Sequence, residues 1–377
     1  MNRLLACFLF CYVASALAAA AADPATTTRE PAHIHWRAAE SVLQADTDWE
    51  REAGHFYPIE ILPDPTEDRL RMYYLVMFRG EPTRSFLCVA FSQDGRTWTK
   101  PDLGDGTNIV MRAAGNAFDW GFFMPSSVLP PDARVRRDEW QLLLWDRRNP
   151  AVRAGYFLAT SPDGFTWETV TPYPIITNAN DATIMIDVNP RATAGPRETT
   201  HLIYQQMWRY DADLPIDRDN LTHMQRGIAI WWAEPFPERW IGPAQILSPD
   251  AADPADLQFY FMAPYHTAEG YGALVSCHHT QNQTMDLQLM FSDDGWTWKR
   301  GFDRASLIPL GRPGTFDSGM IASLSRPVQW RGETMIFYMA RATVHDGQPA
   351  HAGYPLPAMT SGIGLAVIDP TVLGLEP

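Results

Sequence analysis

Four aspartates stand at the same place in a repeated pattern, each just before an apolar run that predicts a β-strand. They are Asp119, Asp181, Asp256 and Asp317. If the repeats bring them together, their mutual repulsion raises the pKa of at least one, which can then hold a proton at neutral pH. A proton donor beside an ionised carboxylate can perform general acid–base catalysis. The alternative is that an Asp here caps a turn through its own backbone, which explains any one of the four equally well but all four less well.

Other side chains near these runs could bind a ligand. Trp120, Trp208 and Tyr260 could form a platform on which the apolar face of a ring stacks, although packing between sheets explains any single aromatic residue better. Asp187, which ends a predicted strand, could reach the same place or serve as a turn residue. Arg341 ends another strand and could steer an anionic ligand, whereas pairing with an exposed acid is the simpler interpretation.

The sequence predicts no cofactor and no metal site. His278 and His279 have no third ligand at a suitable spacing, and neither a CxxC nor an HExxH pattern occurs. A structural calcium ion stays open as an alternative. Cys88 and Cys277 lie in separate apolar runs, which predicts two buried free thiols.

A repeated turn organises the chain. Ser92–Trp98, Ser161–Trp167 and Ser292–Trp298 share the pattern Ser-x-Asp-Gly-x-x-Trp, and each follows an apolar run. Asp-Gly is typical of a tight hairpin turn, because the turn needs a positive φ. The second interval is about double the first, which predicts a copy that has lost the motif; Gly227–Trp240 lies midway and keeps the strand and the closing Trp.

These repeats predict an all-β chain, a five-bladed β-propeller with four-stranded antiparallel blades. The fifth unit ends after Ile363–Asp369 without an outer strand, so we expect a strand around His33–Arg37 to complete it and close the ring. We divide the chain into a signal peptide at 1–22, an N-terminal arm at 23–50 and the propeller domain at 51–377.

The N-terminus and the charge indicate an exported protein. Arg3, an apolar run at Leu4–Val13 and small residues at Ala16–Ala20 are typical of a secretory signal. The run is too short to span a bilayer, so we expect a secreted or periplasmic protein. The formal net charge of −14, without a Lys or Arg cluster, argues against nucleic acid as a partner. We expect a monomer.

The turns, together with Arg71–Tyr74 and Lys100–Gly104, resemble the five-bladed propeller glycoside hydrolases. The likeness is to families 43 and 32, and more broadly to families 62, 68, 117 and 130, close to uncharacterised secreted bacterial members. It implies hydrolysis of glycosidic bonds in poly- or oligosaccharides by carboxylate acid and base residues at the propeller axis.

The resemblance assigns roles to some of the acidic residues and leaves others open. Asp181 matches the family 43 aspartate that tunes the pKa of the acid, and Asp256 stands where the general acid is a Glu. Tyr57 replaces the Asp that serves as base, so Glu60 or Glu50 would substitute for it. In the second unit, Ser126 likewise stands where the family has an Asp.

Two other functions stay open. The missing acids in the first two units favour a non-catalytic carbohydrate-binding propeller. A sialidase-like hydrolase with Tyr57 or Tyr260 as nucleophile would need three arginines around a carboxylate, which the sequence does not visibly arrange. A glycosidase is the leading prediction.

Overall fold

The computed structural model describes residues 30–377 except 79–80, 82–83, 115–122, 136, 149–150, 152–153, 178–182, 190–199 and 211–222. The chain divides into two units, 1–32 and 33–377, and the second contains every strand given below. Among the described residues, no helix is long and apolar enough to cross a membrane. The predicted signal peptide lies outside these residues.

Three antiparallel sheets have four strands each, in chain order. The first comprises β2 (His55–Pro63), β3 (Leu70–Met77), β4 (Ser85–Ser92) and β5 (Ile109–Arg112). The second comprises β6 (Met124–Leu129), β7 (Trp140–Asp146), β8 (Gly155–Ser161) and β9 (Glu168–Thr169). The third comprises β10 (Thr183–Asp187), β11 (His201–Tyr210), β12 (Met224–Ala233) and β13 (Trp240–Leu247).

The remaining strands form one ten-stranded sheet with two halves. One half contains β14 (Leu257–His266), β15 (Tyr271–His279), β16 (Thr284–Ser292), β17 (Lys299–Arg300) and β18 (Ser306–Ile308). The other contains β19 (Met320–Ala322), β20 (Val328–Trp330), β21 (Glu333–Arg341), β22 (Ser361–Ile368) and β1 (Ile34–Arg37). Only one parallel bridge, Met285 with Met320, joins β16 to β19, so each half repeats the layout of the smaller sheets.

Short 3₁₀ helices occupy some of the connections: η1 (Asp48–Glu50), η2 (Ala133–Val135), η3 (Phe302–Arg304) and η4 (Pro370–Leu373). The described part of the chain is therefore all-β and propeller-like, as the sequence predicted.

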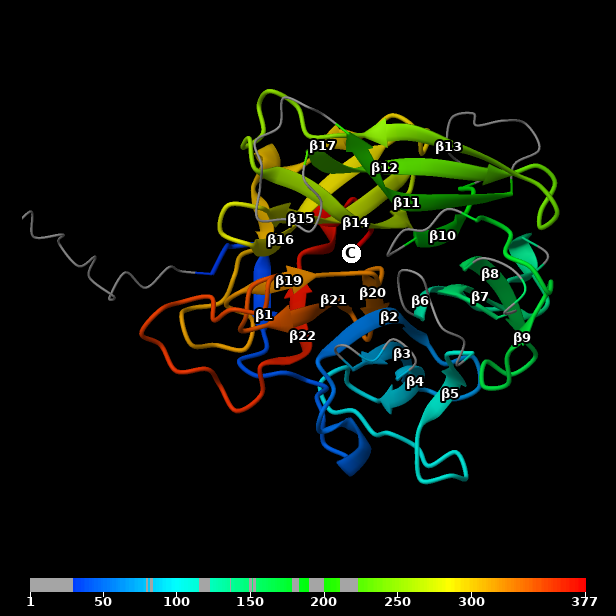
Figure 1. Cartoon of the computed structure of the whole chain (residues 1–377), viewed down its shortest axis with the longest axis horizontal. Coiled ribbons are helices and arrows are strands. Elements are labelled where there is room, and N and C mark those ends of the chain that lie inside the picture. The colour runs from blue at the N-terminus through cyan, green and yellow to red at the C-terminus, as the bar shows by residue number, and fades with distance from the viewer. Residues whose placement is uncertain are drawn as a thin grey trace, which may run out of the picture. The chain divides into compact units, whose positions relative to one another are not determined.

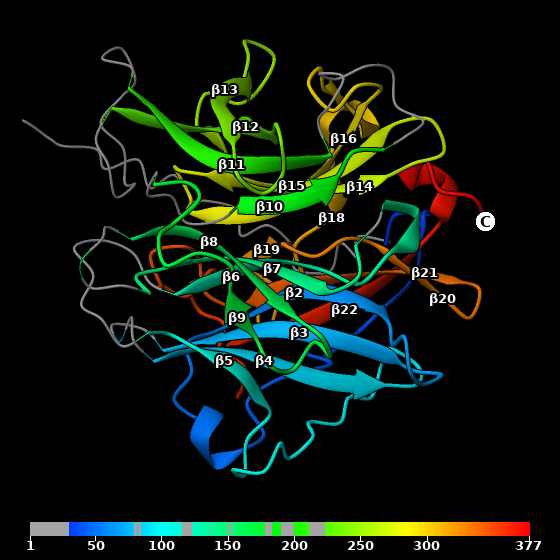
Figure 2. The same cartoon turned by 90° about the vertical axis from the view of Figure 1, so that its right-hand side faces the viewer.

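The sheets are held together by apolar side chains on both of their faces. Every residue of β3, for example, is buried, because a strand covered on both faces needs no polar side. Separate apolar clusters join β3 to β7, β12 to β15 and β16 to β21, and Figures 1 and 2 show β10–β13 beside β14–β15. One further cluster joins β3 to β21 and β22, so the end of the chain packs against its beginning.

The second and third repeated turns each fasten one sheet to the sheet before it in the chain. Within the second turn, the Ser161 hydroxyl accepts from the Gly164 amide at 2.9 Å, and Asp163 accepts from the next two amides. The Tyr73 hydroxyl of β3 then donates to the Gly164 carbonyl at 3.0 Å. A Cβ at Gly164 would lie 2.3 Å from that hydroxyl oxygen, and its φ is +79°, so only glycine fits. Tyr204 of β11 bonds the Gly295 carbonyl of the last turn in the same way, at 2.8 Å.

A strand also forms where the sequence predicts one in the arm. β1 pairs antiparallel with β22 (Figure 1, blue beside red), with Trp36 opposite Val367 and Arg37 opposite Ala366. The Arg37 guanidinium donates to the Pro309 carbonyl at 2.8 Å and pairs with Asp317. Both predicted free cysteines, Cys88 and Cys277, are buried and unpaired with each other, which confirms that prediction.

Candidate active site at the leading end of the inner strands

The first strand of each sheet or half-sheet, namely β2, β6, β10, β14 and β19, is called here an inner strand. β6 packs against β2 and β10, and β10 packs against β14. At one end, His266 of β14 bonds the Asp187 carbonyl of β10 at 2.8 Å, so these strands finish side by side. We call the end where the inner strands begin the leading end and the end where they finish the trailing end.

Tyr260 is the centre of a cluster at the leading end. It lies at a β-bulge, where the pairing of β14 with β15 shifts between Phe259 and Phe261. Bulges redirect side chains and are common beside active sites. The Tyr260 hydroxyl is 3.1 Å from Nε2 of His345, on the segment after β21. Two distant parts of the chain thus meet through one hydrogen bond.

A buried cation lies against the ring of Tyr260. Arg226 of β12 is wholly buried, with its Cζ 3.9 Å from the ring centroid of Trp208 and 4.5 Å from that of Tyr260. Its Nη1 donates to Gln258 Oε1 at 2.9 Å. A cation removed from water gains more from aromatic faces than an exposed one. The arrangement orders the two predicted platform residues, Trp208 and Tyr260, around one guanidinium.

Several buried polar atoms at this end have no hydrogen-bond partner among the described residues. The Trp208 indole nitrogen and Oε1 of Gln206 are two of them. The amide nitrogen of Gln206 does have a partner, because it donates to the Tyr260 carbonyl at 3.0 Å. Unmet buried polar groups cost about 1–3 kcal/mol each and call for a functional explanation.

Histidine and tyrosine side chains complete the cluster. The His278 ring is 4.6 Å from that of His345, and burial, helped by the charges of His345 and Arg226, holds the pKa of His278 well below its usual range. His278 is therefore neutral at neutral pH. Tyr57 of β2 reaches the same region, since its ring is 6.3 Å from Phe261, which in turn is 4.6 Å from Tyr260.

Arg341 lies at the same end but has partners of its own. It pairs opposite Met320, at the start of β19, and its Nη2 donates to the Thr343 hydroxyl at 2.7 Å. Its side chain is buried. This burial differs from the exposed setting that the simpler interpretation assumed for Arg341.

The predicted acids lie in different surroundings. Asp119 and Asp181, like the predicted platform residue Trp120, lie outside the described residues. Asp256 lies just before β14, where its carboxylate accepts from the Gln281 amide at 3.3 Å and its carbonyl accepts from the Thr280 amide at 3.0 Å. It therefore stands at the leading end, and both contacts join it to the turn after β15, about 25 positions further along the chain.

Asp317 and Glu50 are buried in ion pairs, which favours a structural role over the predicted catalytic one. Asp317 pairs with Arg37 and accepts from the Thr315 hydroxyl at 2.8 Å. Glu50 accepts from Lys100 Nζ at 2.7 Å and from the Tyr74 hydroxyl at 3.2 Å. Neither carboxylate keeps a surface for a substrate, because both side chains are almost fully covered.

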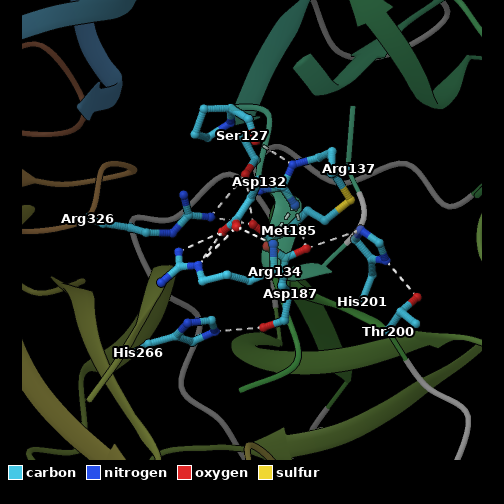
Figure 3. Close-up of polar contacts among 11 residues, drawn as sticks. Ser127, Asp132, Arg134, Arg137, Met185, Asp187, Thr200, His201, His266 and Arg326 are labelled. Carbon is cyan, nitrogen blue, oxygen red and sulfur yellow. Dashed lines mark hydrogen bonds and ion pairs between the residues drawn. The ribbon is translucent and has the colours of Figure 1, made fainter. Parts of the chain in front are cut away.

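Glu60, the other predicted substitute for the base, lies deeper along the inner strands and pairs with Arg326. Figure 3 shows Arg326 among the polar side chains of the trailing end. The same guanidinium donates to the Pro264 carbonyl at 3.1 Å, to the Ser127 hydroxyl at 3.3 Å and to the Met185 carbonyl. One arginine from the segment after β19 thus ties together β2, β6, β10 and β14. Burial raises the pKa of Glu60 to about 7, against the opposing effect of Arg326.

Asp187 belongs to the trailing end, with partners on several elements (Figure 3). Its two carboxylate oxygens accept from Arg137 Nη1 at 2.6 and 2.7 Å, and one lies 3.3 Å from His201 Nε2. Burial lowers the pKa of His201 to about 4 despite Asp187, so the imidazole is neutral. The structure therefore places Asp187 away from the Tyr260 cluster, in a network whose charges already compensate one another.

Sequence reasoning missed Arg226, His278 and His345 as members of the cluster. Arg226 meets Trp208 only because β11 and β12 pair them directly, and no spacing along the chain reveals that. Among the described residues, no three His, Cys, Asp or Glu side chains form a group that could hold a metal ion.

Comparison with known proteins supports the fold. No family profile matches the sequence, and no curated protein matches it. A solved structure named as a BT0996 RGII complex aligns with a TM-score of 0.61 at 12% identity, over 92% of this chain and 94% of the other. A thermostable family-43 glycoside hydrolase aligns with a TM-score of 0.50 at 12% identity, over 87% and 97% of the two chains.

A third structure comes from a study of the GH130 family of mannoside phosphorylases and of glycoside hydrolases that target β-1,2 mannosidic linkages in Candida mannan. It aligns with a TM-score of 0.53 at 10% identity, over 92% of this chain and 95% of the other. The chain therefore has the fold of the propeller-type glycoside hydrolases, including those of families 43 and 130, at low sequence identity.

Proposed function

We propose that this protein is an exported glycoside hydrolase that cleaves glycosidic bonds of poly- or oligosaccharides at the leading end of its inner strands. The observation that carries the proposal is the Tyr260 cluster, in which a cation, two aromatic rings and two histidines from separate sheets converge. Sugars present apolar C–H faces and polar rims, and stacked aromatic rings beside hydrogen-bonding groups suit both.

The framework of the proposal is a closed propeller of five blades. The single bridge between β16 and β19 separates two blades of the large sheet. β1 then completes the last blade, and the cluster shared by β3, β21 and β22 joins that blade to the first. In a closed ring of this kind the inner strands surround one axis, so residues at their leading ends share one mouth.

Cleavage needs a proton donor for the leaving oxygen and a carboxylate that attacks or activates water. We assign these roles to the carboxylates that precede β6, β10 and β14, namely Asp119, Asp181 and Asp256. Tyr260 and His345 would orient the sugar through their hydroxyl and imidazole. His278 is neutral and wholly buried beside His345, so it would support the site without adding a charge to it.

A non-catalytic carbohydrate-binding propeller is the second candidate. It is favoured by the burial of Asp317 and Glu50 in ion pairs and by Tyr57 and Ser126 at positions where the related enzymes have acids. Such a protein would keep the Tyr260 cluster as a binding surface and would release no sugar.

One experiment separates the two. The purified protein is incubated with aryl glycosides, arabinoxylan, galactomannan and yeast mannan, and reducing sugar is followed over time. Asp181→Asn and Asp256→Asn are tested beside it, with Asp293→Asn as the matched control, since Asp293 is exposed. Release that both test variants lose and the control keeps supports the hydrolase. Binding without release supports the second candidate, and neither binding nor release contradicts both.

A further inference from the structure

A groove on the last sheet has the composition of a second sugar-binding surface. Its volume is about 550 Å³, and its lining comes from β1, β20, β21 and β22 and the segment after them. That volume falls within the usual range for small-molecule sites. We propose that this groove binds a neutral glycan chain, apart from the leading end and without taking part in cleavage.

Two tryptophans supply the aromatic surface. Trp36 of β1 is 39% exposed, and Trp330 ends β20 at the turn into β21. Both line the groove. Trp36 is exposed and Trp330 is half-buried, and two indole rings that line one groove suit a ligand with apolar faces.

Both rings are held in place by the first repeated turn. The Trp330 indole nitrogen donates to the Gln93 carbonyl at 2.9 Å, and Arg96 lies 4.8 Å from the ring centroid of Trp36. Residues of one sheet thus position the aromatic residues of another. A rigid platform loses less conformational entropy on binding than a mobile one.

The charges on the rim indicate that the ligand is neutral. Arg96 makes two hydrogen bonds to Glu333, at 2.8 and 2.9 Å, and Arg331 pairs with Asp68 at 2.9 Å. Arg96, Glu333 and Arg331 thus each have a partner of opposite charge within the protein, which weakens their attraction for an ionic ligand. His35 and Gln329 are exposed on the rim and can bond hydroxyl groups. Aromatic faces with neutral hydrogen-bonding groups match a neutral sugar.

The groove is separate from the candidate active site. It is built around Glu333, at the start of β21, whereas Arg341 at the other end of that strand lies at the leading end. Eight residue steps along a strand span roughly 26 Å. One sugar ring cannot contact both the groove and the candidate active site. The groove would therefore hold a long polysaccharide chain and would not affect cleavage of a short glycoside.

The test uses affinity gels that contain arabinoxylan, galactomannan or yeast mannan, with polygalacturonate as the anionic comparison. Trp36→Ala and Trp330→Ala are compared with Tyr173→Ala, an exposed aromatic residue outside the groove. We expect at least one neutral polysaccharide to retard the protein, and the dissociation constant to rise about fivefold or more in each tryptophan variant. Cleavage of an aryl glycoside should stay unchanged in both.

Two further measurements keep the inference open to refutation. Trp36→Phe and Trp330→Phe keep a ring for stacking, so they should bind more tightly than the alanine variants. Equal weakening in variants whose thermal unfolding is unchanged would contradict stacking on these rings. Tyr260→Ala should leave retardation largely intact. The inference is overturned if no neutral gel retards the protein, if the alanine variants bind like the control, if polygalacturonate binds best, or if sedimentation shows that the groove instead joins two copies.

Discussion

The two ends of the inner strands differ in the partners of their buried charged side chains. At the trailing end, Arg326 meets Glu60 and Arg137 meets Asp187, so each charge is met by an opposite one. At the leading end, the Arg226 cation faces aromatic rings, and the Trp208 indole nitrogen has no partner in the described part of the chain. The ion pairs of the trailing end therefore hold strands together, and the leading end is where we propose that a ligand binds.

This difference predicts that the two ends contribute to different properties of the protein, namely stability at the trailing end and ligand binding at the leading end. A fully satisfied network rigidifies a fold, whereas binding sites keep groups that only a ligand satisfies. Changes at the trailing end should therefore lower stability, and changes at the leading end should lower activity or binding. The predictions below test that division.

The largest effect is expected for Arg326→Met. The substitution leaves the Glu60 carboxylate buried without its partner and removes the bonds to β6, β10 and β14. Loss of one member of a buried pair costs about 3–5 kcal/mol. Urea unfolding at pH 7 measures it, with Arg51→Met as the control, since the Arg51–Asp48 pair is exposed.

A double variant sharpens this prediction. Replacing both partners, Glu60→Met with Arg326→Met, removes the uncompensated charge and should recover most of the loss. If the single variant unfolds at the same urea concentration as Arg51→Met, the trailing end is not what holds the inner strands together.

The second-largest effect is expected in the pH dependence of the free energy of unfolding. The pKa of Glu60 is about 7 in the folded protein against 4.5 as the ordinary value, so the folded state binds more protons between these values. Stability should therefore fall as the pH rises from 4.5 to 7, by up to about 3 kcal/mol. Glu60→Gln has no such proton and should lose this dependence.

The measurement is the difference in unfolding free energy between Glu60→Gln and the unsubstituted protein at each pH. His201 acts in the opposite direction, because burial lowers its pKa to about 4 and stability from it rises with pH up to 6.5. That contribution is the same in both proteins and cancels in the difference. A difference that stays constant from pH 4.5 to 7 would contradict the assignment.

At the leading end, Tyr260→Phe should leave stability almost unchanged and lower activity. It removes only the hydroxyl bonded to His345 and keeps the ring against Arg226, so the loss of stability should stay near 1 kcal/mol. We expect kcat/KM to fall about tenfold, equivalent to about 1.4 kcal/mol. Initial rates on the best substrate of the screen measure this.

The matched control is Tyr265→Phe. The Tyr265 hydroxyl is also buried and donates to the Leu373 carbonyl at 2.9 Å, but it lies next to His266, at the trailing end. It should lose a similar amount of stability and no activity. If both variants lose activity equally, the hydroxyl of Tyr260 has no special role at the site.

The sequence was sufficient to predict an all-β, propeller-like fold because the signals for it are local. An Asp-Gly turn after an apolar run identifies a hairpin wherever it occurs, and three copies at related spacings predict a repeated sheet. The same pattern could not reveal that Tyr73 and Tyr204 would fasten those turns to the preceding sheets, since that contact joins residues about 90 positions apart.

The site was harder to predict because its members come from different repeats. Trp208 and Tyr260 were found by residue type. Arg226 and His345 could be assigned to the site only once the pairing of β11 with β12 and the position of the segment after β21 were known. Repeat position alone did not reveal the surroundings of the aspartates. Asp256 and Asp317 occupy the same position in their units, yet only Asp317 meets an arginine from the N-terminal strand.

The smallest effect is expected for Thr200→Val at the trailing end. The Thr200 hydroxyl lies 2.8 Å from His201 Nδ1, but Thr200 is exposed, so water can replace the hydroxyl when it is removed. Stability should fall by about 0.5 kcal/mol at most, and activity should not change. Thermal unfolding and initial rates test both statements. A loss of stability as large as that of Arg326→Met would contradict this prediction. It would mean that the contacts of His201 with Asp187 and Phe236 do not hold the imidazole in place without the Thr200 hydroxyl.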